Sequence, residues 1–166
     1  LADALAAYYI ISPAEVSSNL ARFDGMRYAD RLLGATLREE YNKTRGEGFG
    51  REVRRRIILG TYVLSSGYYD AYYRRAIAVQ NLLRADFAAA FAQVDAVVMP
   101  TTPTTAFKLG EKTADPLQMY LADVYTVPAN IAGLPAITVP DRVDESGLPR
   151  GFQFTVPAIR EDLLFH

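Results

Sequence analysis

Three consecutive arginines and one isolated aspartate are the side chains in this sequence that could recognise a small charged substrate. Arg54, Arg55 and Arg56 follow one another in a segment with helical spacing. Successive residues of a helix point about 100° apart, so at least one of these guanidinium groups should turn toward the protein. An inward arginine needs an anionic partner, because an unpaired buried charge is strongly destabilising. That partner is either an internal carboxylate such as Glu52 or a substrate carboxylate, which the planar guanidinium can bind through two hydrogen bonds.

Asp123 is the second candidate for a binding role. It lies in the otherwise apolar segment MYLADVYTVPAN. A carboxylate in such a segment is either a helix cap or an exposed residue, or it accepts a substrate ammonium group.

Groups that could cleave a bond are scarce in this chain. It has no cysteine, and its one histidine is the last residue, His166. These counts exclude a thiol nucleophile and a disulfide framework, and they argue against a zinc site or a Ser-His-Asp triad. Ser17-Ser18 and Ser65-Ser66 lie in predicted helices and lack the G-x-S-x-G turn. We therefore predict neither a complete hydrolytic site nor a metal site within these residues.

The glycines at 46, 48 and 50 precede the arginine triplet. They lack the G-x-x-x-x-G-K-[ST] order and do not follow a predicted strand. We interpret them as a structural turn and not as a phosphate-binding loop.

Helices should position the candidate residues in the first part of the chain. Apolar spacing predicts one that starts at Pro13 with Ser12 as its cap and stops at Asp24-Gly25. A short charged helix and turn follow, and the pattern is then helical from Arg51 to Phe91. Gly60 and Gly67 mark breaks, close helix contacts or both in that long pattern. The predicted helices span residues 13–23 and 51–91, and the short charged helix with its turn spans residues 34–46.

Strands are expected only in the later part of the chain. Short apolar runs bounded by proline and glycine predict strands at 94–100, 136–140 and 151–156, and the last two could form a hairpin. A helix is expected over 116–132, ending at Gly133, and another should begin at Arg160. Helices followed by strands mixed with helices indicate an α/β or α+β layer structure.

Composition places the chain among ordinary globular proteins. Its 166 residues fit one domain, with 50% hydrophobic and 22% charged residues. The net charge of -1 gives no general attraction to nucleic acid. No segment approaches the ~20 apolar residues that a membrane span requires, and no signal peptide is apparent. We expect a cytosolic-type protein, and we expect a piece of a longer one because both ends fall inside predicted elements.

Several longer segments resemble the amidase signature family, and within it the A subunits of glutamyl-tRNA(Gln)/aspartyl-tRNA(Asn) amidotransferases. The matching segments are YYIISPAEVSSNLARFDGMRY, TRGEGFG, EVRRRIILGTYVLSSGYYDAYY, VVMPTTPTTAFKLGEKTADPLQMYLADVYTVPANIAGLPAITVP and GLPRGFQ. The resemblance covers essentially the whole chain. It implies an α/β fold: a fragment of the amidase-type α/β/α fold around a mixed sheet, helix-rich in its N-terminal half and strand-containing in its C-terminal half. Residues 1–166 would be the C-terminal part of a single domain.

The same resemblance implies an activity that this chain would share only in part. Family members use a Ser–cis-Ser–Lys triad, which is expected upstream of these residues. The A subunit hydrolyses glutamine and releases ammonia to a B subunit. The B subunit uses ATP and Mg to activate the misacylated tRNA, which it chiefly binds, and a C subunit joins the two. No cofactor is expected in this chain, and the location would be the cytoplasm or an organellar matrix.

The resemblance also assigns a glutamine pocket. A free amino acid carries a carboxylate and an ammonium, so its site needs one cation and one anion. The family's carboxylate-binding arginine falls on Arg56, its ammonium-binding aspartate on Asp123, and a pocket tyrosine on Tyr8.

Two departures from the family pattern and two alternatives stay open. Asp141-Arg142 stands where the resemblance implies a small residue and a glycine, and Val156 stands where it implies a glycine. The chain could instead belong to an amidase that acts on a different amide. It could also be an inactive fold fragment or a partner-binding piece.

Overall fold

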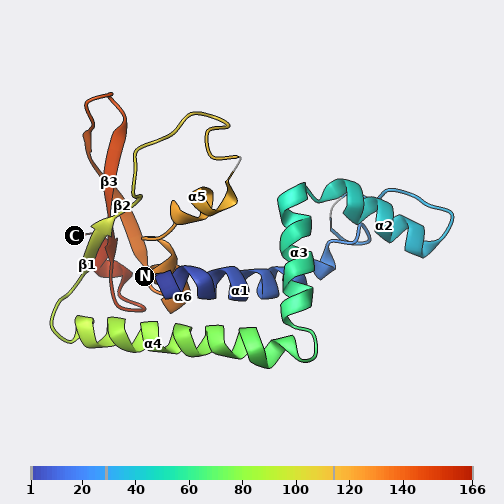
Figure 1. The fold of residues 1–166 in the computed structure, drawn as a ribbon, viewed down its shortest axis with the longest axis horizontal. Coiled ribbons are helices and arrows are strands. Elements are labelled where there is room, and N and C mark those ends of the chain that lie inside the picture. The colour runs from blue at the N-terminus through green and yellow to red at the C-terminus, as the bar shows by residue number, and fades with distance from the viewer. Residues whose placement is uncertain (1, 29, 114, 166) are drawn as a thin grey trace. The chain divides into compact units, whose positions relative to one another are not determined.

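The computed structural model describes residues 2–28, 30–113 and 115–165 (Figure 1). The chain divides into two compact units. Unit 1 comprises Leu1–Tyr8 and Ile77–His166, and unit 2 comprises Tyr9–Ala76. The helices are α1 (Ala2–Asn19), α2 (Leu37–Gly48), α3 (Arg51–Val63), α4 (Arg74–Phe91), α5 (Pro116–Leu121) and α6 (Val127–Ala132). The strands are β1 (Val97–Pro100), β2 (Ala136–Val143) and β3 (Pro149–Thr155), and single helical turns lie at Leu20–Arg22, Tyr69–Tyr73 and Glu161–Leu164.

In unit 2, α1 and α3 approach each other closely at Gly60. A Cβ atom added to Gly60 would lie 1.9 Å from the carbonyl oxygen of Pro13 and 2.9 Å from the Cβ of Ser17. Only glycine permits this approach, so of the roles that the sequence allowed for Gly60 the structure shows a close helix contact. Ile11, Ala14 and Val63 are buried in the same unit.

The predicted start of the first helix at Pro13 is wrong. Pro13 lies inside α1, which begins at Ala2. A proline within a helix loses one backbone hydrogen bond. Here Pro13 is fully buried and in contact with α3 at Gly60, so tertiary packing offsets the local cost.

The long helical pattern from Arg51 is divided into three pieces. α3 ends at Val63, residues 64–68 turn around Gly67, and a π-helical turn at Tyr69–Tyr73 leads into α4. The predicted glycine turn before α3 is shorter than expected, because α2 continues through Gly48. Arg54, Arg55 and Arg56 lie in α3, as predicted.

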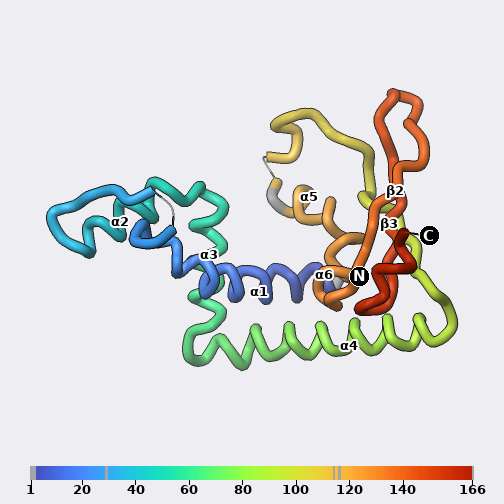
Figure 2. The backbone as a smooth tube through the Cα atoms, turned by 180° about the vertical axis from the view of Figure 1, so that it is seen from behind, coloured from blue at the N-terminus to red at the C-terminus, as the bar shows by residue number. Residues whose placement is uncertain are grey.

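Unit 1 contains a three-stranded sheet in the order β1-β3-β2. Figure 2 labels two of these strands, β2 and β3, which are hydrogen-bonded neighbours. β3 is central and antiparallel to both neighbours, so the predicted β2–β3 hairpin is confirmed. Gln153 and Thr155 of β3 are buried polar residues on one face of the sheet. Its register aligns Val98 and Ile137 with Phe154, and Pro100 and Val139 with Phe152, on the other face.

The predicted helix over 116–132 is interrupted. α5 ends at Leu121, a turn spans 122–126, and α6 runs from Val127 to Ala132, with Gly133 closing it at φ +73°. Pro128 explains the interruption, because a proline in the interior of a continuous helix would remove a hydrogen bond and clash with the preceding turn, whereas the first helical turn tolerates it. The start and the end of this region were predicted correctly and the break was not.

The remaining predictions for the end of unit 1 hold in part. β1 begins three residues later than Val94, β2 extends beyond Pro140, and the helix expected from Arg160 is one 3-10 turn. The chain is thus a mixed helix–strand structure, helix-rich in its first half, with a small antiparallel sheet toward its end. Within residues 2–28, 30–113 and 115–165, no helix has both the length and the apolar character needed to cross a membrane.

Candidate functional site

Arg56 is less exposed than its neighbour Arg55 on α3. Its side chain is 29% exposed, compared with 53% for Arg55. Arg56 Nε lies 3.0 Å from Glu52 Oε1, one helical turn earlier. Arg56 is thus less exposed than Arg55, and Glu52 is an internal carboxylate that it contacts.

The neighbouring arginines have different surroundings. Arg55 Nη1 lies 3.6 Å from the other oxygen of Glu52, and Arg54 Nη1 donates to the Gly46 carbonyl at 3.2 Å. Glu52 is itself 52% exposed, so both of its ion pairs are open to solvent. Exposed pairs of this kind contribute at most about 1 kcal/mol.

Asp123 lies in the turn between α5 and α6 and not inside a helix as expected. Its backbone N–H donates to the Tyr120 carbonyl at 3.1 Å, and its carbonyl accepts from Thr126 and Val127 at 3.1 and 3.0 Å. The residue is exposed. The backbone of this turn is thus fixed by hydrogen bonds while the residue itself is accessible.

Tyr8 is half-buried in α1 and belongs to unit 1, as does Asp123, whereas Arg56 belongs to unit 2. Each side chain has interactions of its own within the protein. The combination of Tyr8, Asp123 and Arg56 into one glutamine pocket therefore stays a prediction.

Two of the serines considered as nucleophiles, Ser17 in α1 and Ser65 in the turn after α3, donate to nearby backbone carbonyls, so Ser65 does not lie in a helix as predicted. Ser17 Oγ donates to the Ala14 carbonyl at 2.8 Å, and Ser65 Oγ donates to the Tyr62 carbonyl at 2.6 Å. Both hydroxyls thus have the local bonding that is common for serine in helices and turns. In the part of the chain that the structure describes, no three His, Cys, Asp or Glu side chains are grouped to hold a metal ion.

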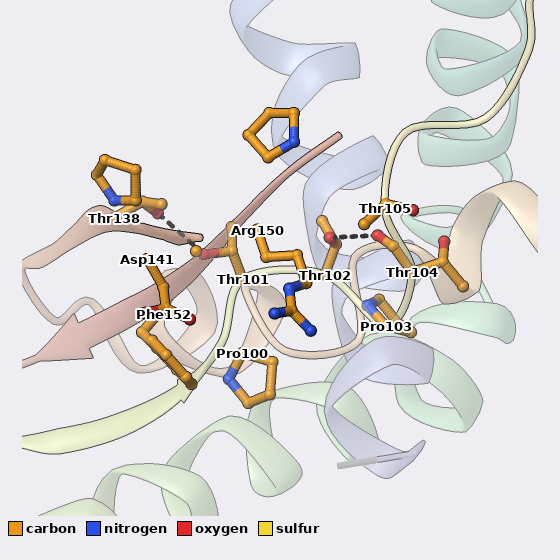
Figure 3. A pocket seen from close by; sticks show the side chains of 13 residues that line it. Pro100, Thr101, Thr102, Pro103, Thr104, Thr105, Thr138, Asp141, Arg150 and Phe152 are labelled. Carbon is orange, nitrogen blue, oxygen red and sulfur yellow. Dashed lines mark hydrogen bonds between the residues drawn. The ribbon is translucent and has the colours of Figure 1, made fainter. Parts of the chain in front are cut away.

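A cavity of about 550 Å³ opens beside the Thr-Pro loop (Figure 3). Thr102 Oγ1 donates to the Thr104 carbonyl at 2.7 Å and so shapes the loop. The cavity is lined by Pro100–Thr105, Thr138, Pro140, Asp141 and Pro149–Phe152. None of the three predicted substrate-binding residues lines it.

The structure shows where the residues that depart from the family pattern lie. Asp141 lies where the β2–β3 register shifts between Pro140 and Val143 and forms part of the cavity wall. Val156 is 1% exposed and its N–H donates to the Pro135 carbonyl at 3.1 Å. A buried valine thus fills core space where the family pattern has glycine.

Sequence reasoning missed a side chain that contacts the Asp123 turn. Gln153 of β3 is 5% exposed, and its Nε2 donates to the Tyr125 carbonyl at 3.3 Å. The available signal was an amide between two phenylalanines in the strand GFQFT, because a buried amide needs a hydrogen-bonding partner.

Comparison with known proteins shows similarity along almost the entire chain. Residues 1–165 match the amidase family. The chain is 59% identical over 163 residues to the A subunit of the glutamyl-tRNA(Gln) amidotransferase from Synechococcus elongatus, covering 98% of this chain and 34% of that protein. It is 59% identical over 162 residues to the protein of the same name from Maricaulis maris, covering 98% and 33%. This chain thus spans about a third of the length of these curated relatives.

Solved structures agree with the sequence match. The crystal structure of the glutamyl-tRNA(Gln) amidotransferase A subunit from Thermotoga maritima is 41% identical, with a TM-score of 0.60, covering 92% of this chain and 28% of that one. A 6-aminohexanoate cyclic dimer hydrolase is 18% identical, with a TM-score of 0.63, covering 97% and 32%, and this likeness concerns the fold alone. Together with the family match over residues 1–165, these similarities lead to one conclusion: the chain belongs to the amidase family.

Proposed function

We propose that this chain is part of the glutaminase subunit of a tRNA-dependent amidotransferase. The observation that carries the proposal is the 59% identity to a glutamyl-tRNA(Gln) amidotransferase A subunit, which extends over 98% of the chain. The glutaminase would hydrolyse glutamine with water to glutamate and ammonia. The ammonia would convert Glu-tRNA(Gln), Asp-tRNA(Asn) or both to the amidated forms.

Residues 1–166 would form the C-terminal part of a single amidase-type domain, and the catalytic Ser–cis-Ser–Lys triad would come from the rest of it. The sheet supports this arrangement. Val98, Val139 and Phe152 on its apolar face are 50%, 43% and 43% exposed. Further secondary structure of the domain would cover this face and add the strands of a larger mixed sheet, since apolar sheet faces are stable when another layer packs on them.

Glutamine would be bound through its two charged α-groups. Arg56 would exchange Glu52 for the substrate carboxylate, which is favoured by bidentate geometry. The exposed Asp123 would accept the ammonium group, and Tyr8 would line the pocket. Recognition of both α-groups would select a free amino acid over a simple amide.

The other components would be supplied by partner proteins. A B subunit would use ATP and Mg to activate the misacylated tRNA that it binds, and a C subunit would join it to the glutaminase. The complex would act in the cytoplasm or in an organellar matrix.

A chimaera tests the proposal without assumptions about flanking sequence. In it, the matching third of the Synechococcus elongatus A subunit is replaced by these 166 residues, and the product is assembled with its partners. We expect hydrolysis of glutamine and slow hydrolysis of simple amides. A chimaera that hydrolyses simple amides but not glutamine would indicate a different amidase, and one that assembles without any turnover would indicate an inactive piece.

A further inference from the structure

A buried glutamine side chain connects the centre of the sheet to the turn that carries Asp123. Gln153 lies on β3, between Met99 of β1 and Thr138 of β2. Its Nε2 donates to the Tyr125 carbonyl at 3.3 Å and is 3.5 Å from Thr155 Oγ1. An amide is an expensive group to bury, so its hydrogen-bonding partners determine where the surrounding backbone can lie.

The hydrogen bond from Gln153 reaches the turn two residues after Asp123. The Asp123 carbonyl is fixed separately, because it accepts from the N–H groups of Thr126 and Val127. The turn at 122–126 is therefore held to α6 at one point and to the sheet at another. The exposed Asp123 projects from backbone that is anchored on both sides.

The opposite end of α6 is anchored by α4. Gln80 Nε2 donates to the Ile131 carbonyl at 2.9 Å, and Arg84 Nε donates to the Ala132 carbonyl at 3.2 Å. Gln80 and Arg84 are one helical turn apart and satisfy carbonyls at the helix C-terminus, where a positive charge is also favourable. Gln80 thus resembles Gln153 in chemistry but acts at the end of α6 remote from Asp123.

We propose that Gln153 is a positioning residue for the ammonium-binding carboxylate of Asp123. This role rests on the proposed function, in which Asp123 binds the α-amino group of glutamine. Gln153 itself would not touch the substrate. Its loss should weaken recognition of the ammonium group and leave the reacting amide and its hydrolysis unchanged.

The test compares two substrates in the chimaera, glutamine and glutaramate, which is glutamine without its α-amino group. Gln153→Met keeps the length of the side chain and removes the donor. We expect KM for glutamine to rise about tenfold, as the loss of a buried hydrogen bond would give, with kcat changed less than about twofold. KM for glutaramate should stay at its unsubstituted value, because that substrate makes no contact with Asp123.

Gln80→Met is the matched control. It removes a comparable hydrogen bond from the other end of α6, so it should lower the thermal midpoint to a similar extent and leave KM for glutamine unchanged. Gln153→Asn is a second variant, which keeps the donor on a shorter side chain. It should fall between the unsubstituted protein and Gln153→Met in KM for glutamine.

The outcomes separate this role from the proposed function. An active chimaera in which Gln153→Met leaves KM for glutamine unchanged, or raises KM for both substrates equally, would overturn the positioning role alone. The same holds if both Gln153 variants fail to assemble while Gln80→Met assembles, because Gln153 would then serve folding. An unsubstituted chimaera without glutaminase activity would overturn the proposed function and this role with it.

Discussion

Arg56 has a partner that a substrate could displace. Its ion pair with Glu52 spans one helical turn, and the Glu52 side chain is half exposed. If Arg56 serves only to bind Glu52, removal of either residue should have the same effect. If Arg56 binds the carboxylate of glutamine, substitution of Arg56 should raise KM for glutamine more than substitution of Glu52.

We therefore expect unequal results from the two variants in the chimaera. Arg56→Ala should raise KM for glutamine at least about tenfold, because it removes a charge-assisted hydrogen bond to the substrate. Glu52→Gln should change KM less than about fivefold, since it removes only an exposed ion pair. Steady-state glutaminase kinetics measure both, and equal KM values for the two variants would contradict a substrate role for Arg56.

Tyr62 gives a prediction about pH. Its hydroxyl is hydrogen-bonded to Tyr68, and the two ring centroids are 4.1 Å apart. The hydrogen bond, followed by desolvation and the nearby tyrosines, raises the pKa of Tyr62 from 10.0 to about 12. The folded state therefore retains this proton more strongly than the unfolded state. The contribution to stability is complete below pH 10 and is lost as the pH rises through about 12.

Phenolate absorbance against pH should include a component near pH 12 that comes from Tyr62. Tyr68→Phe removes the hydrogen-bond partner and should return the pKa of Tyr62 toward 10.0. Tyr28→Phe is a control because Tyr28 lies outside this group and packs on Phe23. An unchanged high-pH transition in Tyr68→Phe would refute this origin of the shift.

At the scale of elements, the α1–α3 crossing depends on the missing side chain of Gly60. Gly60→Ala would place Cβ 1.9 Å from the Pro13 carbonyl oxygen, so the helices would have to separate. We expect a loss of about 1–3 kcal/mol in stability, which is typical of overpacking. Gly46→Ala in α2 is the matched variant, since a Cβ there meets no atom within 4 Å and alanine favours a helix.

Thermal midpoints of the two chimaera variants test this contrast. Gly60→Ala should lower the midpoint, and Gly46→Ala should leave it unchanged or raise it. A midpoint for Gly60→Ala equal to that of the unsubstituted chimaera would show that the crossing tolerates a methyl group.

The elements also show what local pattern could and could not predict. Periodicity located the β2–β3 hairpin and the stop at Gly133, because these features depend on residues close in sequence. It wrongly started the first helix at Pro13. Pro13 is accommodated inside α1 because it packs against Gly60, which is far away in the sequence. It missed the anchor of the Asp123 turn for the same reason, since Gln153 and Tyr125 are far apart in sequence.

At the scale of the whole molecule, one apolar face of the sheet is partly exposed, and our proposal is that another layer of an amidase domain covers it. Val98, Val139 and Phe152 are about half exposed although they lie on the same face of the sheet, one on each strand. The sequence predicted the three strands, and the family resemblance predicted a larger sheet. The local pattern could not predict which face of the three-stranded sheet would be exposed. Which face is exposed depends on the register in which the strands pair.

Two isosteric substitutions on β2 test whether the rest of an amidase domain covers this face. Val139→Thr should lower the thermal midpoint of the chimaera, by an amount that corresponds to about 1–3 kcal/mol, because it would bury an unpaired hydroxyl. Val143→Thr is the control, since Val143 lies beyond the register shift and is 60% exposed. Equal midpoints for the two variants would contradict a covered face.

The central claim, that Arg56 and Asp123 bind the two α-groups of glutamine, is tested most directly by substrates that lack one group each. In the chimaera, KM would be measured for glutamine, for glutaramate without the amino group and for 4-aminobutanamide without the carboxylate. We predict that Asp123→Asn raises KM for glutamine at least about tenfold without affecting glutaramate, and that Arg56→Ala raises KM for glutamine similarly without affecting 4-aminobutanamide. Changes of equal size for all three substrates, or unchanged KM values in both variants, would contradict the claim.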